Sequence, residues 1–432
     1  MEAIRLVNGL PVYEAGHATH MYGPLHTVAL AGIFRIAGLN LLAARIIFSL
    51  AALVLAATAT TLCSRGALRK YWVIGLLLFL AVSFRTSIIF FSAQPDCIAA
   101  LLGIVGLTMW ITRRNSVLRG ILSILLFLTA MFFKQTAAAF ALIPPLYAML
   151  WNRPLRVRAV GVSLIPLGAL CFALLLLRLG WPTVFASMVT IPASIQIRGD
   201  RLLPAAIYLL ATFPVLLVAV GAAIAGERTV AEQWIIAAGV GLVPVSIWAT
   251  IKSGGSYNSL LPAYLAMTAL FVVQLDKLSK WIRDLGGSRT LWAEWTIAVA
   301  VLCSFFFQSD RAFTLLVDRW GDDKYDTVVA LARHFRNGVV CPQDPTIPYR
   351  ANGYIGRSLF YELDAHAVSG NWPNELPLSL QQEMRSSKYV IQVNGFVPAA
   401  VFDRGLRALD FSPLAIDSLN DSAYTIWAKK AN

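Results

Sequence analysis

The chain has 432 residues, of which 58% are apolar and only 14% are charged, and its mean hydropathy is +0.66. Soluble globular proteins hold about half apolar and about a quarter charged residues, so this composition excludes an ordinary soluble protein. The net charge of +13 does not indicate nucleic-acid binding, because the basic residues lie in short loops between apolar blocks and form no contiguous basic face.

The apolar blocks in the first three hundred residues are long enough to cross a bilayer. A hydrocarbon core about 30 Å thick needs roughly 20 apolar residues in a helix. We predict about ten membrane-spanning helices, near residues 40–64, 72–90, 95–112, 117–133, 136–151, 158–178, 203–225, 231–250, 258–275 and 291–308.

The loops between these blocks alternate in their content of lysine and arginine. Arg65, Arg69 and Lys70 follow the first block, for example, whereas the loop at residues 92–95 has no basic residue. Because cytoplasmic loops carry the excess of Lys and Arg, the basic loops are assigned to the cytoplasm. The chain is then a multi-pass protein of the inner (plasma) membrane, surrounded by membrane lipids.

The same alternation places residue 39 outside the cytoplasm. The stretch Pro24–Ala37 is apolar but too short to span comfortably, so we predict an interfacial or re-entrant helix within an outer segment of residues 1–39. Residues 1–308 form the predicted all-α polytopic membrane domain. An additional span upstream of Met1 is expected, because nothing in residues 1–23 would carry that segment across the membrane.

After residue 308 charged residues return, and helical and strand patterns alternate. Residues 326–335 and 398–409 have helical spacing, whereas 339–341, 388–393 and 424–428 indicate strands. We predict that residues 309–432 form a small soluble α/β domain, which the loop alternation places outside the cytoplasm.

Several ionisable residues lie at the predicted outer ends of spans. Asp96 begins an apolar block, and a carboxylate at membrane depth is a functional hypothesis by default; the alternative is a residue that only starts a helix. Lys134 and Lys252 could each meet a lipid phosphate, or could simply extend their ammonium groups to the interface. His17, His20 and His26 form a cluster that could contact substrate or, with a carboxylate, a metal ion.

Short motifs at these positions resemble those of a known family. They are Arg5-Leu-Val-Asn-Gly-Leu-Pro-Val-Tyr13, Tyr22-Gly-Pro-Leu-His26, Gly38, Ala44-Arg45, Gln94-Pro-Asp96, Lys134-Gln-Thr136 and Lys252-Ser-Gly-Gly-Ser-Tyr-Asn258 with Leu261-Pro262. In this order and on one common side, they resemble GT-C glycosyltransferases, which use polyprenyl-phosphate sugars. That group includes protein O-mannosyltransferases and the lipid A aminoarabinose transferase. The resemblance covers roughly residues 1–280.

The resemblance implies a membrane glycosyltransferase that moves a sugar from a polyprenyl-phosphate donor to a lipid, polysaccharide or protein acceptor at the outer face. It implies a catalytic Asp96, with Glu2 and Glu14 as weaker candidates for an acid in the first outer loop; for Glu14 we favour the alternative of an ordinary loop charge. No nucleotide cofactor and no nucleic-acid partner are expected, and a divalent metal ion remains open. The substrate-binding candidates are His17, His20, Tyr22, His26, Lys134, Gln135, Lys252, Tyr257 and Asn258.

One departure and two alternatives stand beside this interpretation. The family has a catalytic Asp or Glu well before the motif that is Gly9-Leu-Pro-Val-Tyr13 in this chain. Gly9 lies too close to Met1 for such a residue to precede it. We favour a start codon set too late over a truncated or inactive relative. A transporter or flippase of a lipid-linked saccharide is the main alternative, followed by a non-catalytic relative. Transporters often have internal repeats and midplane sites, whereas here no repeat is found and the polar candidates lie at the outer ends.

Overall fold

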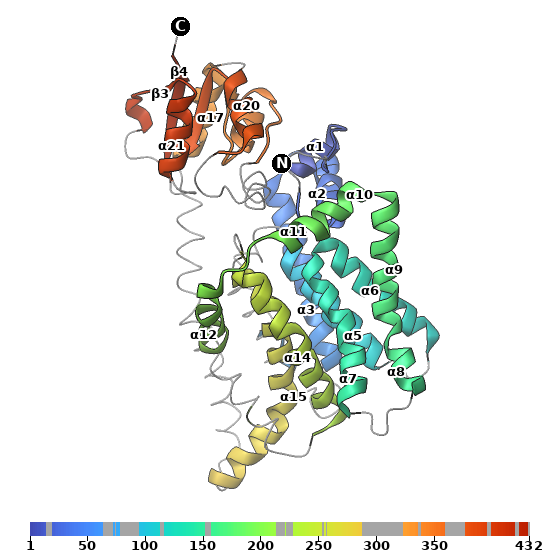
Figure 1. Cartoon of the computed structure of the whole chain (residues 1–432). Helices are drawn as coiled ribbons and strands as arrows, with labels where there is room; N and C mark the ends of the chain where they lie inside the picture. Colours follow the sequence, from blue (N-terminus) through green and yellow to red (C-terminus); the bar gives the residue numbers. More distant parts are fainter. Residues whose placement is uncertain are drawn as a thin grey trace.

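A computed structural model of the chain describes all residues except 14–19, 64–71, 74, 78–94, 113–115, 152–156, 213–220, 222–227, 253–254, 256, 287–322, 336–337, 359–375, 395–398, 420–422 and 431–432. The described residues form a bundle of apolar helices with a small sheet at one end (Figure 1). We call this end of the bundle the sheet end.

The helical part runs from the N-terminus to Gly286. Its elements are α1 (Glu2–Val7), α2 (Pro24–Ala37), α3 (Leu41–Cys63), α5 (Pro95–Ile111), α6 (Val117–Phe133), η3 (Gln135–Leu142), α7 (Ile143–Trp151), α8 (Val157–Ser163), α9 (Ile165–Gly180), α10 (Pro182–Phe185), η4 (Ala186–Thr190), α11 (Ile191–Ser194), η5 (Gly199–Arg201), α12 (Leu202–Thr212), α14 (Val230–Ile251), η6 (Tyr257–Leu260) and α15 (Leu261–Gly286).

The predicted helices at 40–64, 95–112, 117–133 and 231–250 are confirmed as α3, α5, α6 and α14, with ends that differ by no more than one residue. Helices containing Leu41–Thr58, Val230–Ile251 and Asn258–Leu275 are long and apolar enough to cross a bilayer. Shorter apolar helices, among them α5 and α6, accompany them. The predicted spans near 72–90 and 291–308 lie mostly or wholly outside the described residues, so the number of ten spans stays a prediction.

Prolines explain where other predicted spans are interrupted. The span expected at 136–151 is a 3-10 helix, η3, followed by α7. Pro144 and Pro145 have no N–H to bond the carbonyls four residues earlier, so an α-helix could not continue through them with full hydrogen bonding. The span expected at 158–178 is divided into α8 and α9 at Leu164, just before Pro166. The loop expected after Gly180 is itself helical through α10, the π-helix η4 and α11.

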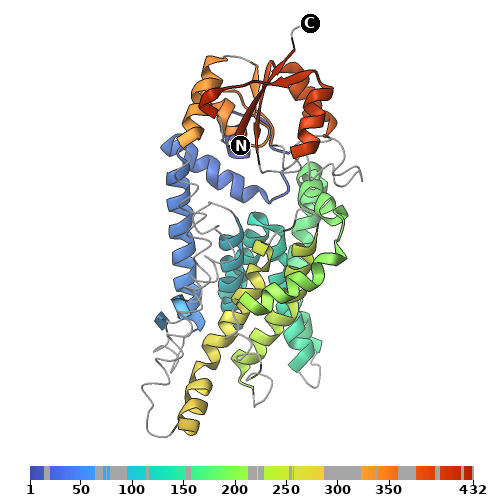
Figure 2. The same cartoon turned by 90° about the vertical axis from the view of Figure 1, so that its left-hand side faces the viewer.

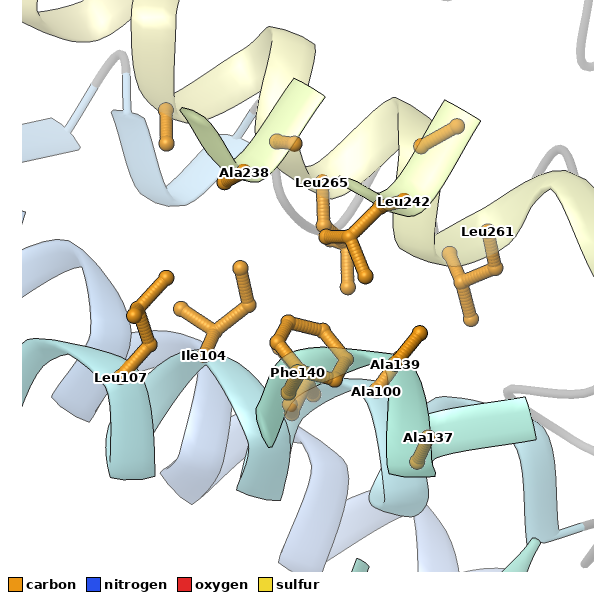
Figure 3. Close-up of a cluster of buried hydrophobic side chains, with 14 of the residues drawn as sticks. Ala100, Ile104, Leu107, Ala137, Ala139, Phe140, Ala238, Leu242, Leu261 and Leu265 are labelled. Carbon is orange, nitrogen blue, oxygen red and sulfur yellow. The ribbon is translucent and has the colours of Figure 1, made fainter. Parts of the chain in front are cut away.

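The core of the bundle forms where α5 and η3 face α14 and α15 (Figure 3). The ring of Phe140 is fully buried there, and a Cβ on Gly103 would lie 2.2 Å from that ring. Small side chains such as Ala100 and Ala238 allow the helices to approach closely, as is common between membrane helices. This packing fixes the start of α5 relative to η3 and α15, which matters for the site described below.

The C-terminal part is a four-stranded sheet of order β1-β2-β4-β3. The parallel pair is β1 (Val339–Val340) and β2 (Tyr389–Val393), and β4 (Tyr424–Lys429) is antiparallel to β2 and to β3 (Phe411–Pro413). Successive residues of a strand point to opposite faces. Accordingly Val390 packs with α20 (Leu378–Ser386) and α21 (Ala399–Ala408), whereas Ile391 packs with α17 (Asp323–His334) and α18 (Thr346–Asn352). The α/β architecture predicted for this region is confirmed, and β3, α18 and α20 are additions to the prediction.

The sheet part contacts the bundle through a mixed apolar cluster. Tyr349 of α18 and Ile355 pack with α1, α2, the first half of α3 and Ile98 of α5. Figure 2 shows α2 lying across the bundle between the sheet and the other helices; the interfacial position of this helix in a membrane stays a prediction. Since Ile98 lies two residues after Asp96, the start of α5 belongs to the sheet end.

Candidate functional site

Three of the predicted site residues line one pocket at the sheet end. Asp96 of α5, Lys134 between α6 and η3, and Asn258 of η6 border one small pocket. The other described lining residues are Ala99, Ala100, Thr136, Ala137, Ser259, Leu261 and Pro262. The pocket therefore combines one ion pair and three neutral hydrogen-bonding side chains with small apolar walls.

Asp96 is held by the start of a helix. Pro95 is the first residue of α5, where its fixed φ angle suits a helix and its missing N–H has no cost. Asp96 follows in the first turn, where the positive end of the helix dipole favours a carboxylate. Asp96 as a whole is only 5% exposed. The two interpretations of Asp96, a helix start and a site residue, are thus compatible in the structure.

Lys134 is placed by the end of α6. Its backbone is extended, with φ −150° and ψ 122°, so the chain changes direction between α6 and η3. The side chain reaches α5, and Nζ of Lys134 donates to Oδ1 of Asp96. Only 9% of the Lys134 side chain and 4% of the Asp96 side chain are exposed. A buried charge is costly unless it is paired, so each residue provides the charge that the other needs.

The segment around Tyr22 docks onto this same corner. Nε2 of Gln135 donates to the carbonyl of Met21 at 2.9 Å, and Tyr13 donates from its hydroxyl to the carbonyl of Tyr22 at 2.8 Å. The ring centroid of Tyr22 lies 5.8 Å from Nζ of Lys134, within the range of a cation–π contact. Gln135 and Tyr22, both predicted to bind substrate, are thus neighbours of Lys134 outside the described pocket lining.

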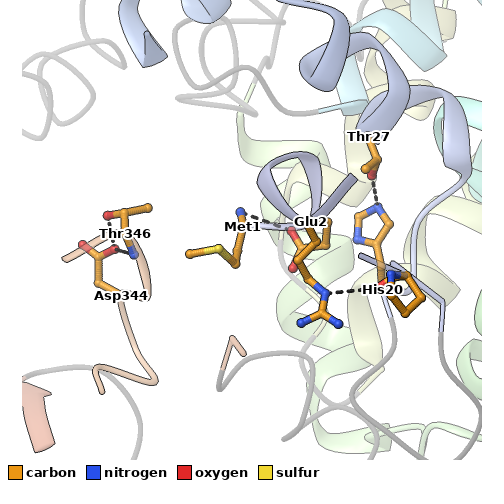
Figure 4. A network of polar contacts seen from close by, with 8 residues as sticks. Met1, Glu2, His20, Thr27, Asp344 and Thr346 are labelled. Carbon is orange, nitrogen blue, oxygen red and sulfur yellow. Dashed lines mark hydrogen bonds and ion pairs between the residues drawn. The ribbon is translucent and has the colours of Figure 1, made fainter. Parts of the chain in front are cut away.

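His20 lies beside this segment rather than in the pocket. Its Nε2 is 2.9 Å from the hydroxyl of Thr27 in α2 (Figure 4), and its ring contacts those of Tyr13 and Tyr22. Burial lowers the pKa of His20 to about 4, although nearby Glu2 acts in the opposite direction. His20 is therefore neutral near pH 7. His26 sits edge-on to Phe48, with ring centroids 5.6 Å apart.

Other predicted site residues are not brought to the pocket. Lys252 donates to the carbonyl of Pro192, and its Nζ lies 3.4 Å from the ring centroid of Trp248. Glu2 is on α1, close to His20. The backbone of Tyr257 belongs to η6, next to Asn258. Glu14 and His17 lie outside the described residues.

A metal site is not evident in the described part of the chain, where no three His, Cys, Asp or Glu side chains come together. Among the described residues that line the pocket, the single carboxylate, Asp96, is already paired with an ammonium. The described arrangement suits an anion contacting Lys134 and a hydroxyl group contacting Asp96.

Some residues of the site had no distinct signal in the sequence. Thr136 and Ser259 line the pocket, but hydroxyl side chains are common near helix ends.

At the opposite end of the bundle, Glu232 of α14 is fully buried and paired with Lys277 of α15 at 2.7 Å. Only the capping sequence Thr229-x-x-Glu232 could have pointed to that carboxylate.

Comparison with known proteins identifies the fold. No protein-family model matches the chain, and no curated protein matches its sequence. Among solved structures it is similar to that of ArnT from Cupriavidus metallidurans bound to undecaprenyl phosphate, with a TM-score of 0.58 at 14% sequence identity. The match covers 100% of this chain and 92% of the ArnT chain. The resemblance to GT-C glycosyltransferases predicted from the sequence is therefore confirmed at the level of the fold.

Proposed function

We propose that this chain is a membrane glycosyltransferase that moves a sugar from a polyprenyl-phosphate donor to an acceptor at the outer face of the membrane. The supporting observation is the buried Asp96–Lys134 pair, which shares a pocket with Asn258. The pocket lies in a fold shared with a protein that was solved with undecaprenyl phosphate bound. A carboxylate and an ammonium are the groups that such a transfer requires.

In the proposed reaction, Asp96 accepts the proton of the acceptor hydroxyl while the hydroxyl oxygen attacks the anomeric carbon of the sugar. The bond between that carbon and the phosphate oxygen breaks, and its electron pair leaves with the polyprenyl phosphate, which gains one negative charge. Lys134 stabilises this charge. The side chains of Thr136, Asn258 and Ser259, which line the pocket, supply hydrogen bonds to the sugar or phosphate.

The proposed sidedness follows from the alternation of basic loops. The pocket, α2 and the sheet part would face the extracytoplasmic side of the inner membrane, where the sheet part lies near an incoming acceptor. A fusion of alkaline phosphatase to the C-terminus tests this, because the phosphatase is active only outside the cytoplasm. An inactive phosphatase fusion together with a fluorescent cytoplasmic reporter fusion would contradict it.

The decisive experiment is sugar transfer by the purified chain in lipid nanodiscs, with polyprenyl-phosphate sugars as donors. Asp96→Asn is expected to lower the rate by about 100-fold or more, as for loss of a general base. The control is Asp284→Asn, which removes an exposed carboxylate at the far end of α15 and should leave the rate unchanged. Undiminished transfer by Asp96→Asn would remove Asp96 from the mechanism. Movement of the intact lipid-linked sugar across vesicles without transfer would support the flippase alternative.

A further inference from the structure

The pocket holds a single basic side chain among its described lining residues, Lys134. Two cations that lie in or contact the segment just before η6 already have other partners. Besides Lys252, which is bound to Pro192 and Trp248, Arg201 donates to the carbonyls of Lys252 and Gly255 at 3.4 and 3.3 Å. A phosphate entering this pocket therefore finds its positive charge at Lys134.

The ammonium group of Lys134 is already bound to a carboxylate. Nζ of Lys134 is paired with Asp96, and both side chains are more than nine-tenths buried. The ring centroid of Tyr22 also lies 5.8 Å from this Nζ. An incoming phosphate must consequently compete with the carboxylate of Asp96 for the same ammonium group.

We infer that donor binding releases Asp96: the donor phosphate takes Lys134 away from Asp96, and only then is the carboxylate free to accept the acceptor's proton. This inference rests on the proposed function and adds an order to it, in which the donor binds before the base becomes available. A carboxylate held by an ammonium accepts a proton less readily than one beside an anion. The exchange of partners therefore converts Asp96 from a counter-ion into a base.

Competition for Lys134 has a consequence that transfer assays do not measure. Removal of the carboxylate should free the ammonium and strengthen the binding of a lipid phosphate, even though transfer is lost. The test measures the binding of undecaprenyl phosphate to the full chain in nanodiscs. Asp96→Asn should bind it about tenfold more tightly than the wild type, and Lys134→Gln about tenfold more weakly, as expected for closely coupled charges.

Asp96→Asn could tighten phosphate binding either by releasing Lys134 or simply by removing a negative charge. The double variant Asp96→Asn/Lys134→Gln distinguishes these two causes. It should bind as weakly as Lys134→Gln alone. Asp284→Asn and Lys280→Gln, which change exposed charges on α15, are the matched controls and should bind like the wild type. Because loss of one partner from a buried pair can destabilise a protein, Asp96→Ser is a second single variant, and thermal unfolding identifies folded samples.

Two results would overturn the inference. The first is that Asp96→Asn and Asp96→Ser bind undecaprenyl phosphate no more tightly than the wild type. The second is that Asp96→Asn still tightens the binding of undecaprenyl phosphate when Lys134 is already glutamine. The carboxylate would then weaken binding by repelling the phosphate and not by holding the lysine. Failure of the wild type itself to bind would instead contradict the proposed function, so the two failures are distinguishable.

Discussion

Gly23 lies so close to Phe132 that a Cβ atom on Gly23 would fall 1.9 Å from the carbonyl oxygen of Phe132. Its φ of −67° and ψ of 154° are open to any residue, so glycine is needed here for space and not for conformational freedom. The contact joins the segment that precedes α2 to the end of α6, two residues before Lys134. It thereby holds Tyr22 beside the ammonium of Lys134.

Gly23→Ala is expected to separate these two segments. The methyl group meets backbone atoms, which cannot move aside as a flexible side chain would, and overpacking of this kind costs about 1–3 kcal/mol. We expect a lower midpoint of thermal unfolding in detergent and slower sugar transfer. Gly32→Ala in α2 is the control, because its Cβ would have nothing within 4 Å. Equal unfolding midpoints for the two variants would show that the close approach is unimportant.

Gln135 is expected to act on the position of the Tyr22 segment. Gln135→Glu replaces the Nε2 donor that bonds the carbonyl of Met21 at 2.9 Å with an acceptor, and two acceptors repel each other. Loss of such a partly buried hydrogen bond costs about 1–3 kcal/mol. Hydrogen exchange should become faster at the amides of residues 20–23. Gln381→Glu, which breaks a similar bond to the carbonyl of Leu376 in the sheet part, should leave exchange at residues 20–23 as in the wild type.

The fold could be predicted from the sequence to the extent that periodicity and composition determine it. α3 and α6 were predictable because long apolar blocks end at charged or polar residues. β2 was predictable because its sequence, Tyr-Val-Ile-Gln-Val, is rich in β-branched and aromatic residues. The 3-10 form of η3 was less accessible, since it depends on how the chain satisfies backbone hydrogen bonds before Pro144. β3 has only three residues, too few for a period to be visible.

The candidate site was predictable in its charged residues but not in their partners. Asp96 and Lys134 stand out because charges are rare in apolar blocks, yet their 38-residue separation says nothing about contact. Lys252 looked equivalent to Lys134 in the sequence. It differs because its ammonium lies on Trp248 and bonds Pro192, and these contacts depend on tertiary packing that a single sequence does not reveal.

The ion pair between Glu232 and Lys277 is expected to serve stability rather than transfer. Glu232 is fully buried and completes a capping box with Thr229, whose N–H donates to Oε2 of Glu232 at 2.6 Å. Glu232→Ala should lower the free energy of unfolding by about 2 kcal/mol through loss of the cap and of a buried charged bond. Lys277→Ala should also lower the free energy of unfolding, because it leaves the buried carboxylate of Glu232 without its counter-ion. The affinity for undecaprenyl phosphate should change in neither variant, and a large change would show that the two ends of the bundle are coupled.

His20 should make stability depend on pH between its ordinary pKa of 6.5 and its pKa of about 4 in the folded protein, which burial lowers. In this window the unfolded chain binds a proton that the folded chain excludes, so the free energy of unfolding falls as the pH falls. A shift of this size corresponds to about 3 kcal/mol at pH 4. His20→Asn, which cannot titrate, should lose less stability than the wild type when the pH drops from 7 to 4. His334→Asn changes an exposed residue of α17 and should keep the wild-type dependence. Identical losses in the wild type and His20→Asn would mean that His20 takes up its proton without leaving its place beside Thr27.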